Sequence, residues 1–121
     1  MNVKGIAWLG TPTERYAEMK GFATDVLGLR AQKDEPEFSV YSLPDGDVLE
    51  IFGPKAIAEG HQFMSAPVAG FLVDDVRSAR QEMEAKGILF IGPVHSDPKY
   101  GLWSHFFAPD GHVYEITSRA R

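Results

Sequence analysis

A repeated hairpin constrains the fold of this 121-residue chain more than any other feature of its sequence. The segments Phe38–Ile51 and Trp103–Ile116 align at a constant offset of 65 residues, and seven of the fourteen aligned positions are identical. In each copy, two apolar runs flank the sequence Pro-Asp-Gly. Proline fixes φ and glycine supplies the positive φ that a tight turn needs. Self-similarity at a fixed offset indicates a duplicated structural module.

A helix pattern precedes each hairpin. The first helix is expected to begin with a capping box at Thr11–Glu14 and to end at Gly28. The second is expected to begin at Asp74 or Asp75 and to end at Gly87. The residues predicted to face the core are Tyr16, Met19, Phe22, Ala23 and Val26 in the first helix, and Val76, Ala79 and Met83 in the second.

Strand patterns complete each copy. Apolar runs at Val3–Leu9 and Ala66–Val73 precede the helices, and short strands are expected near Leu29–Gln32 and Ile88–Ile91 after them. The second copy carries about six extra residues in Gly92–Gly101, a segment that reads either as a lid or as an irregular edge.

The element order is therefore β-α-β-β-β, twice. This order predicts an α+β fold in one domain, residues 1–121, with module one at about 1–53, a connector at 54–65 and module two at about 66–121. The strand Val48–Phe52 is apolar on both faces apart from Glu50, so one face is expected to pack on a helix and the other to line a ligand cavity. We expect a curved mixed sheet around that cavity, between the two modules, with the helices outside.

Composition excludes several classes of function. The chain has no cysteine, which removes thiol catalysis, thiolate metal sites and disulfides. Its net charge of −5, without a basic face, argues against nucleic acid as a partner. No apolar run approaches the ~20 residues that span a bilayer, so no membrane partner is expected. The N-terminus lacks the apolar run of a secretory signal, which favours a cytoplasmic location.

Three motifs resemble those of the vicinal oxygen chelate superfamily, which includes glyoxalase I, extradiol dioxygenases, fosfomycin-resistance enzymes and bleomycin-resistance proteins. They are Phe22–Leu29 (FATDVLGL), Val73–Asp75 and Ala108–Glu115 (APDGHVYE). The resemblance covers nearly the whole chain and implies paired βαβββ modules, a small-molecule ligand and a homodimer. It does not indicate the reaction, since the superfamily spans isomerisation, ring cleavage, thiol addition and binding alone.

The resemblance also implies where a metal would bind. Metal-dependent members place ligands at positions that correspond here to Trp8, Glu50, Val68 and Glu115. Tryptophan and valine offer no donor atom to a divalent ion, so we expect no metal cofactor. The alternative is one divalent metal ion held by Glu50, Glu115 and His105.

The alternative site depends on the register of the second hairpin. A three-residue Pro-Asp-Gly loop would place His105 opposite Glu115, and a two-residue loop would place Phe106 there. The other histidines, His61 and His95 in loops and His112 beside the turn, are expected to be polar surface residues.

The leading hypothesis is a metal-independent binding protein that sequesters a hydrophobic or aromatic compound, as bleomycin-resistance-type members do. Any single aromatic residue in these strands could serve packing alone. The expected ligand contacts are Trp8, Phe38, Glu50, Phe52, Trp103, His105 and Glu115. The alternative is a glyoxalase-like lyase or isomerase, or a dioxygenase, that uses a metal with Glu50, Glu115 and His105. A third hypothesis is metal-free acid–base catalysis by Glu115 and His105.

Overall fold

The computed structural model describes residues 1–60 and 66–119. His61 and part of the predicted connector lie outside these residues. The chain divides into two units, one made of Trp8–Val68 and the other of Met1–Ala7 with Ala69–Arg121. Each unit contains one copy of the repeated hairpin, so each is described by itself.

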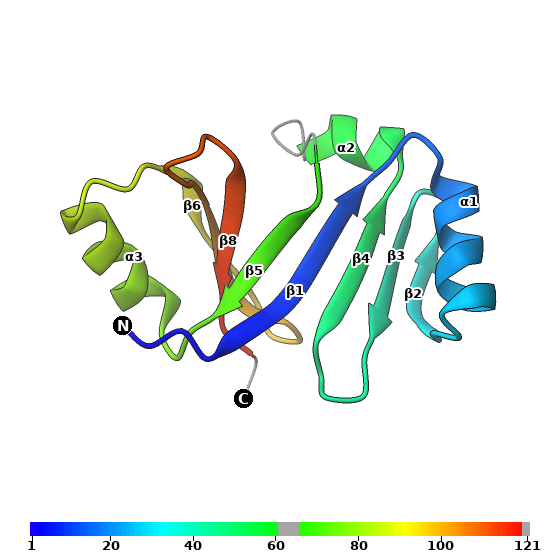
Figure 1. The fold of residues 1–121 in the computed structure, drawn as a ribbon, viewed down its shortest axis with the longest axis horizontal. Helices are drawn as coiled ribbons and strands as arrows, with labels where there is room; N and C mark the ends of the chain where they lie inside the picture. Colours follow the sequence, from blue (N-terminus) through cyan, green and yellow to red (C-terminus); the bar gives the residue numbers. More distant parts are fainter. Residues whose placement is uncertain (61–65, 120–121) are drawn as a thin grey trace. The chain divides into compact units, whose positions relative to one another are not determined.

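The unit with the first repeat has four strands and a helix on one face (Figure 1). The strands are β1 (Gly5–Pro12), β2 (Ala31–Glu35), β3 (Phe38–Ser42) and β4 (Val48–Phe52), in the order β2-β3-β4-β1. Strand β1 pairs with β4 in parallel, and the other pairs are antiparallel. Helix α1 (Tyr16–Gly21) continues into a π-helical turn, Phe22–Val26. The buried core of this unit comprises Ala23, Tyr41 and Ile51. Helix α2 (Pro54–Gly60) follows β4 within the predicted connector.

The unit with the second repeat has the same plan. Its strands are β5 (Val68–Leu72), β6 (Phe90–Asp97), β7 (Gly101–Phe107) and β8 (Val113–Thr117), in the order β5-β8-β7-β6. Strand β5 is parallel to β8, and the remaining pairs are antiparallel. Helix α3 (Val76–Ala85) packs on one face through Val76, Ala79 and Met83. The predicted α+β fold with a mixed strand arrangement is confirmed.

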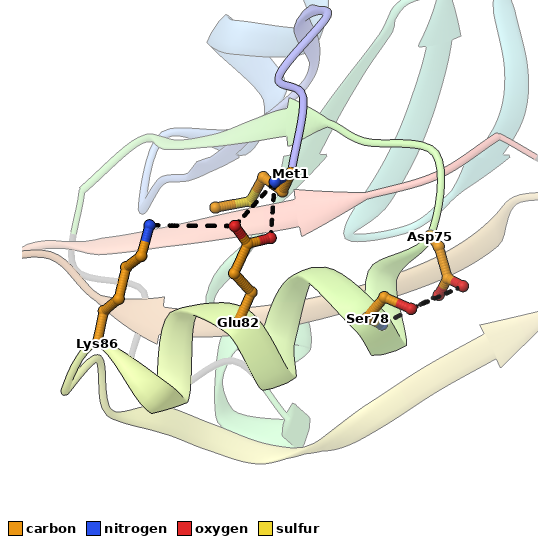
Figure 2. A network of polar contacts seen from close by, with 5 residues as sticks. All are labelled: Met1, Asp75, Ser78, Glu82 and Lys86. Carbon is orange, nitrogen blue, oxygen red and sulfur yellow. Dashed lines mark hydrogen bonds and ion pairs between the residues drawn. The ribbon is translucent and has the colours of Figure 1, made fainter.

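The start of the chain belongs to this second unit. The Lys4 backbone N donates to the Leu72 carbonyl at 2.9 Å, and the Lys4 ammonium pairs with Asp74. Figure 2 shows the Met1 amino group between the two carboxylate oxygens of Glu82 on α3, at 2.7 and 2.9 Å. Lys86 lies one turn further along the helix, 4.0 Å from the same carboxylate.

Helix α3 begins and ends as predicted. The Asp75 carboxylate accepts a hydrogen bond from the Ser78 backbone N at 3.1 Å, which is an N-cap contact, and Gly87 follows the helix with φ 89° (Figure 2). Helix α1 differs from the prediction. Strand β1 runs through Thr11 and Pro12, so the helix starts at Tyr16 without a side-chain cap.

The apolar face predicted for the first helix is only partly correct. Tyr16, Met19 and Ala23 pack against the strands, but Phe22 is 44% exposed and Val26 is 71% exposed. The π-helical turn over Phe22–Val26 has a longer period than the α-helix that was assumed, so residues placed by α-helical spacing leave the buried face. Most of the segment Gly92–Gly101 belongs to the edge strand β6, whose register shifts between Ile91 and His95, so of the two alternatives the irregular edge is the one observed.

Candidate functional site

The predicted site residues of the second repeat share one face of the strands. Along β7 and β8, Phe106 and Ile116 pack into the core beneath α3. Side chains alternate between the two faces of a strand, so Trp103, His105 and Glu115 lie on the face opposite α3. The helix and the site residues therefore occupy opposite sides of the same strands.

His105 and Glu115 are direct cross-strand neighbours. The His105 Nε2 lies 3.2 Å from the Glu115 Oε1, and the two residues are 7% and 3% exposed. A backbone hydrogen bond from Ala108 N to His112 O, at 2.9 Å, closes a loop of three residues, Pro109–Gly111. The three-residue loop is thus the one present, and of the two registers left open by the sequence, the one that pairs His105 with Glu115 is formed.

Burial shifts both groups of this pair toward their uncharged forms. Desolvation lowers the pKa of His105 from 6.5 to about 4, and it raises the pKa of Glu115 well above 4.5. Burial therefore favours a carboxylic acid facing a neutral imidazole in this pair. Such a pair can donate a hydrogen bond from the acid, accept one at the imidazole, or move a proton between them.

In the first repeat, the strand face opposite the helix carries a glutamate at the equivalent position but a different set of neighbouring side chains. Tyr41 and Ile51 pack toward α1, so Phe38, Val40, Glu50 and Phe52 lie on the opposite face. Val40 is opposite Glu50, where the second repeat has His105 opposite Glu115. The rings of Phe38 and Phe52 stack with their centroids 5.2 Å apart.

Each of the two glutamates has a glycine as its partner on the neighbouring parallel strand. Gly10 of β1 pairs with Glu50, and Gly70 of β5 pairs with Glu115. Trp8 is on the same face as Glu50, because it pairs with Val48 two residues away along β4. Both glycines are buried, so each carboxyl group has a strand neighbour without a side chain on this side.

The residues present do not fit a divalent metal centre of the kind that the resemblance implies. Trp8 and Val68 lie in β1 and β5 and have no donor atom suited to a divalent ion. Over residues 1–60 and 66–119, no three histidine or carboxylate side chains come together as a set of ligands. Within its own unit, Glu50 has Val40 and Gly10 as strand neighbours, and Glu115 has His105 and Gly70.

His95 was not among the predicted site residues, because it was expected to lie in a loop. His95 lies in β6 directly opposite Trp103, and the two rings stack with centroids 5.6 Å apart and planes 21° apart. It therefore shares the face of Trp103 and His105. The sequence signal for this position is the apolar residue Val94, which packs toward α3. Because side chains alternate along a strand, His95 then points to the opposite face.

A groove of about 360 Å³ lies on the other face of this unit. Its walls are Phe71, Phe106 and Tyr114, together with the Pro109–Asp110 turn. Phe106 and Tyr114 belong to or pack against the core beneath α3, so this groove is separate from the face of His105 and Glu115.

No helix of the described part of the chain is long and apolar enough to cross a membrane. No curated protein sequence matches the chain significantly. Several solved structures share its fold at low sequence identity. A Mn(II)-bound glyoxalase from Novosphingobium aromaticivorans is 21% identical with a TM-score of 0.73, and the match covers 98% of this chain and 42% of that one.

Two shorter proteins match over nearly their whole length. A methylmalonyl-CoA epimerase from Mycobacterium tuberculosis is 12% identical with a TM-score of 0.71, covering 98% of this chain and 90% of that one. A superfamily member from Vibrio splendidus 12B01 is 19% identical with a TM-score of 0.64, covering 92% and 95%. A family model matches residues 5–116 of the chain. With the repeated modules and this match together, the chain belongs to the glyoxalase/bleomycin resistance protein/dioxygenase superfamily.

Proposed function

We propose that this protein is a metal-independent binding protein that sequesters a hydrophobic or aromatic small molecule, as in antibiotic resistance of the bleomycin type. The observation that carries the proposal is the composition of one face in each unit. In the first repeat Trp8, Phe38 and Phe52 share a face with Glu50, and in the second repeat Trp103 shares a face with Glu115, in each case opposite the helix. Aromatic walls with a few polar groups are typical of sites for flat organic ligands.

The residues divide into two roles under this proposal. Trp8, Phe38, Phe52 and Trp103 supply flat apolar surface for stacking. Glu50, His105 and Glu115 orient the ligand through hydrogen bonds. Trp8 and Val68 offer no donor atom to a divalent ion. This favours ligand binding without a metal, in contrast to the Mn(II)-bound glyoxalase from Novosphingobium aromaticivorans.

A second candidate function is enzymatic, and the His105–Glu115 pair is the observation that favours it. A buried carboxyl group in contact with an imidazole can act as a general acid or base once a substrate displaces water. One solved structure with this fold, from Mycobacterium tuberculosis, is a methylmalonyl-CoA epimerase. An isomerase or lyase reaction at this pair is the alternative to sequestration, and a dioxygenase would require the metal that the donor set does not favour.

The test is a binding titration with a flat, uncharged fluorescent probe, N-phenyl-1-naphthylamine. Replacing Trp103→Ala should weaken binding by ~1–3 kcal/mol, a loss of about tenfold to hundredfold in affinity, because it removes a stacking surface. The matched control is Phe71→Ala, which removes an aromatic ring that packs on the α3 side. The control should lower the melting temperature and keep the affinity of the folded protein. Equal affinity in wild type and a well-folded Trp103→Ala variant would refute the proposal.

The remaining parts of the proposal concern partners and location. By analogy with the family, we expect a homodimer, and sedimentation equilibrium of the purified protein measures this. No nucleic acid or membrane partner is expected, and the cytoplasm is the expected location.

A further inference from the structure

We propose that the groove beside the second hairpin turn is a separate binding site for a small organic cation of the methylated ammonium class. The groove lies on the α3 side of the strands, so the inference goes beyond the proposed function, which concerns the opposite face. Its volume of about 360 Å³ falls in the range of small-molecule sites, roughly 300–1,000 Å³. The residues that line it all belong to the unit with the second repeat: Phe71, Phe106, Ala108, Pro109, Asp110 and Tyr114.

The first support is a row of three aromatic rings along the groove. Phe71, Tyr114 and Phe106 come from β5, β8 and β7, which are neighbours in that order (Figure 1). The Tyr114 ring stacks on Phe71 with centroids 5.7 Å apart and on Phe106 with centroids 6.2 Å apart. Phe106 is buried, whereas Phe71 and Tyr114 are half-buried. Aromatic rings attract cations, and methylated ammonium ions are a group that aromatic sites recognise.

The second support is a negative charge in the same groove. Among the described residues that line it, Asp110 is the one with a charged side chain. The Asp110 Oδ1 accepts from the His112 backbone N at 3.0 Å, and the Oδ2 lies 3.2 Å from the His112 Nδ1. The backbone hydrogen bond lowers the pKa of Asp110, so its carboxylate is ionised at neutral pH. Each carboxylate oxygen can accept more than one contact, so Asp110 can also face a cation.

The first repeat provides an internal comparison. Asp45 occupies the equivalent turn position, and its Oδ1 accepts from the Asp47 backbone N at 3.1 Å. Leu49, however, stands where the second repeat has Tyr114, so the ring at the centre of the row is missing. The turn alone thus accounts for an aspartate in both repeats, and the combination of that charge with an aromatic row belongs to the second repeat.

Charge complementarity and ring composition together define the ligand. Its cationic head lies against the rings of Phe71 and Tyr114, with the Asp110 carboxylate as counter-charge. Its methyl groups also bury apolar surface on the same rings. A neutral molecule of the same shape would keep the apolar contact and lose both charge-dependent contacts.

Choline and 3,3-dimethyl-1-butanol test the inference, because the two have nearly the same shape and only choline is charged. Each is titrated into nitrogen-15-labelled protein, and binding is followed by the backbone amide signals of Phe71, Ala108, Asp110 and Tyr114. Choline should shift these signals in a saturable way. It should bind at least about fivefold more tightly than the alcohol, because it gains the ring and carboxylate contacts.

The variants separate the groove from general charge effects. Asp110→Asn keeps an acceptor for the turn and should weaken choline by about twofold to fivefold without changing the affinity for the alcohol. Asp45→Asn is the matched control, because it removes the same charge from the equivalent turn, and it should bind choline as wild type does. Tyr114→Leu introduces the residue of the first repeat and should weaken choline by about fivefold. Asp110→Asn, at an exposed position, carries the test if Tyr114→Leu does not fold.

Three results would each overturn the inference. They are the absence of a saturable shift at the groove amides, equal affinities for choline and the alcohol, and wild-type choline affinity in Asp110→Asn. Choline shifts confined to Trp103 and His105 would place the cation on the opposite face and would overturn it too. All of these leave the proposed function standing, because that function is tested by the loss of probe binding in Trp103→Ala.

Discussion

At the scale of single residues, the two repeats differ most in how buried polar groups are satisfied. Ser39 and Ser104 are equivalent positions, and both are fully buried. The Ser104 Oγ accepts from Arg80 at 3.1 Å. The Ser39 Oγ has no hydrogen-bond partner among the described residues, and neither does the hydroxyl of its neighbour Tyr41. One copy therefore carries a buried polar cost that the other avoids.

This difference predicts opposite effects of the same substitution. Ser104→Ala should lower the free energy of unfolding by about 1–2 kcal/mol, because Arg80 loses a buried acceptor. Ser39→Ala should change it by less than about 0.5 kcal/mol or raise it, because only an unpartnered hydroxyl is lost. Chemical denaturation of the two variants measures both values. A larger loss for Ser39→Ala than for Ser104→Ala would contradict the assignment.

The His105–Glu115 pair predicts how stability depends on pH. His105 has its pKa lowered to about 4 in the folded state, so its contribution is present above pH 6.5 and is lost as the pH falls toward 4. Glu115 has a raised pKa, so its contribution is present below pH 4.5 and is lost as the pH rises toward its folded value. The two residues therefore oppose each other between these limits.

Single substitutions should separate the two contributions. Glu115→Gln should flatten the fall of stability at rising pH, and His105→Asn should flatten the fall at decreasing pH. Urea denaturation from pH 4.5 to 9 measures both, with Glu14→Gln, at an exposed position, as the control. If Glu115→Gln leaves the alkaline side of the profile as in wild type, Glu115 is not held in its protonated form.

At the scale of elements, Arg80 connects α3 to the strands that carry the site. Its guanidinium reaches the Gly92 carbonyl and the Ser104 hydroxyl, and it lies 4.9 Å from the centre of the Phe90 ring. Gly92 and Phe90 both belong to β6, the edge strand that bears His95. The Arg80 side chain on α3 therefore anchors the irregular edge strand β6.

Removing this anchor should loosen β6. Arg80→Met should lower the free energy of unfolding by about 1–3 kcal/mol and speed amide hydrogen exchange in Phe90–Asp97. Arg77→Met is the matched control, because Arg77 lies on the same helix and is exposed. The control should keep the exchange rates of wild type. Equal exchange in β6 for both variants would mean that the backbone holds the bulge without Arg80.

At the scale of the whole molecule, the two copies have kept the strands, the hairpin turns and the two glutamates. They have diverged at the residues around those glutamates, where Val40 in one copy corresponds to His105 in the other. Glu50, Glu115 and His105, without donors at the Trp8 and Val68 positions, are a poor ligand set for a divalent ion.

This donor set predicts the metal content of the purified protein. Protein made without a histidine tag should contain less than about 0.1 equivalent of Mn, Fe, Ni or Zn per chain, because each unit offers too few ligands for a closed site. Inductively coupled plasma mass spectrometry measures this directly. A full equivalent that is lost in both Glu50→Gln and Glu115→Gln would instead favour the metal-dependent enzyme.

Much of the fold follows from local sequence signals. The Pro-Asp-Gly turns place Gly46 and Gly111 at φ 92° and 85°, and the helix cap at Asp75 forms as expected, because each depends on neighbouring residues alone. The pairing of His105 with Glu115 was one of two registers that the sequence allowed. The backbone hydrogen bonds that close the three-residue loop selected it.

The sequence by itself determined the duplicated modules, the family and the equivalent positions of the two glutamates, because these depend on repeated motifs and on short-range turn and helix signals. Only the tertiary structure decided that β1 continues to Pro12, that Phe22 and Val26 are exposed, and that His95 stacks on Trp103. The physical reason is the same in each case. Strand pairing, a π-helical turn and a bulge held by Arg80 depend on partners far away in the sequence, and periodicity along one segment does not contain them.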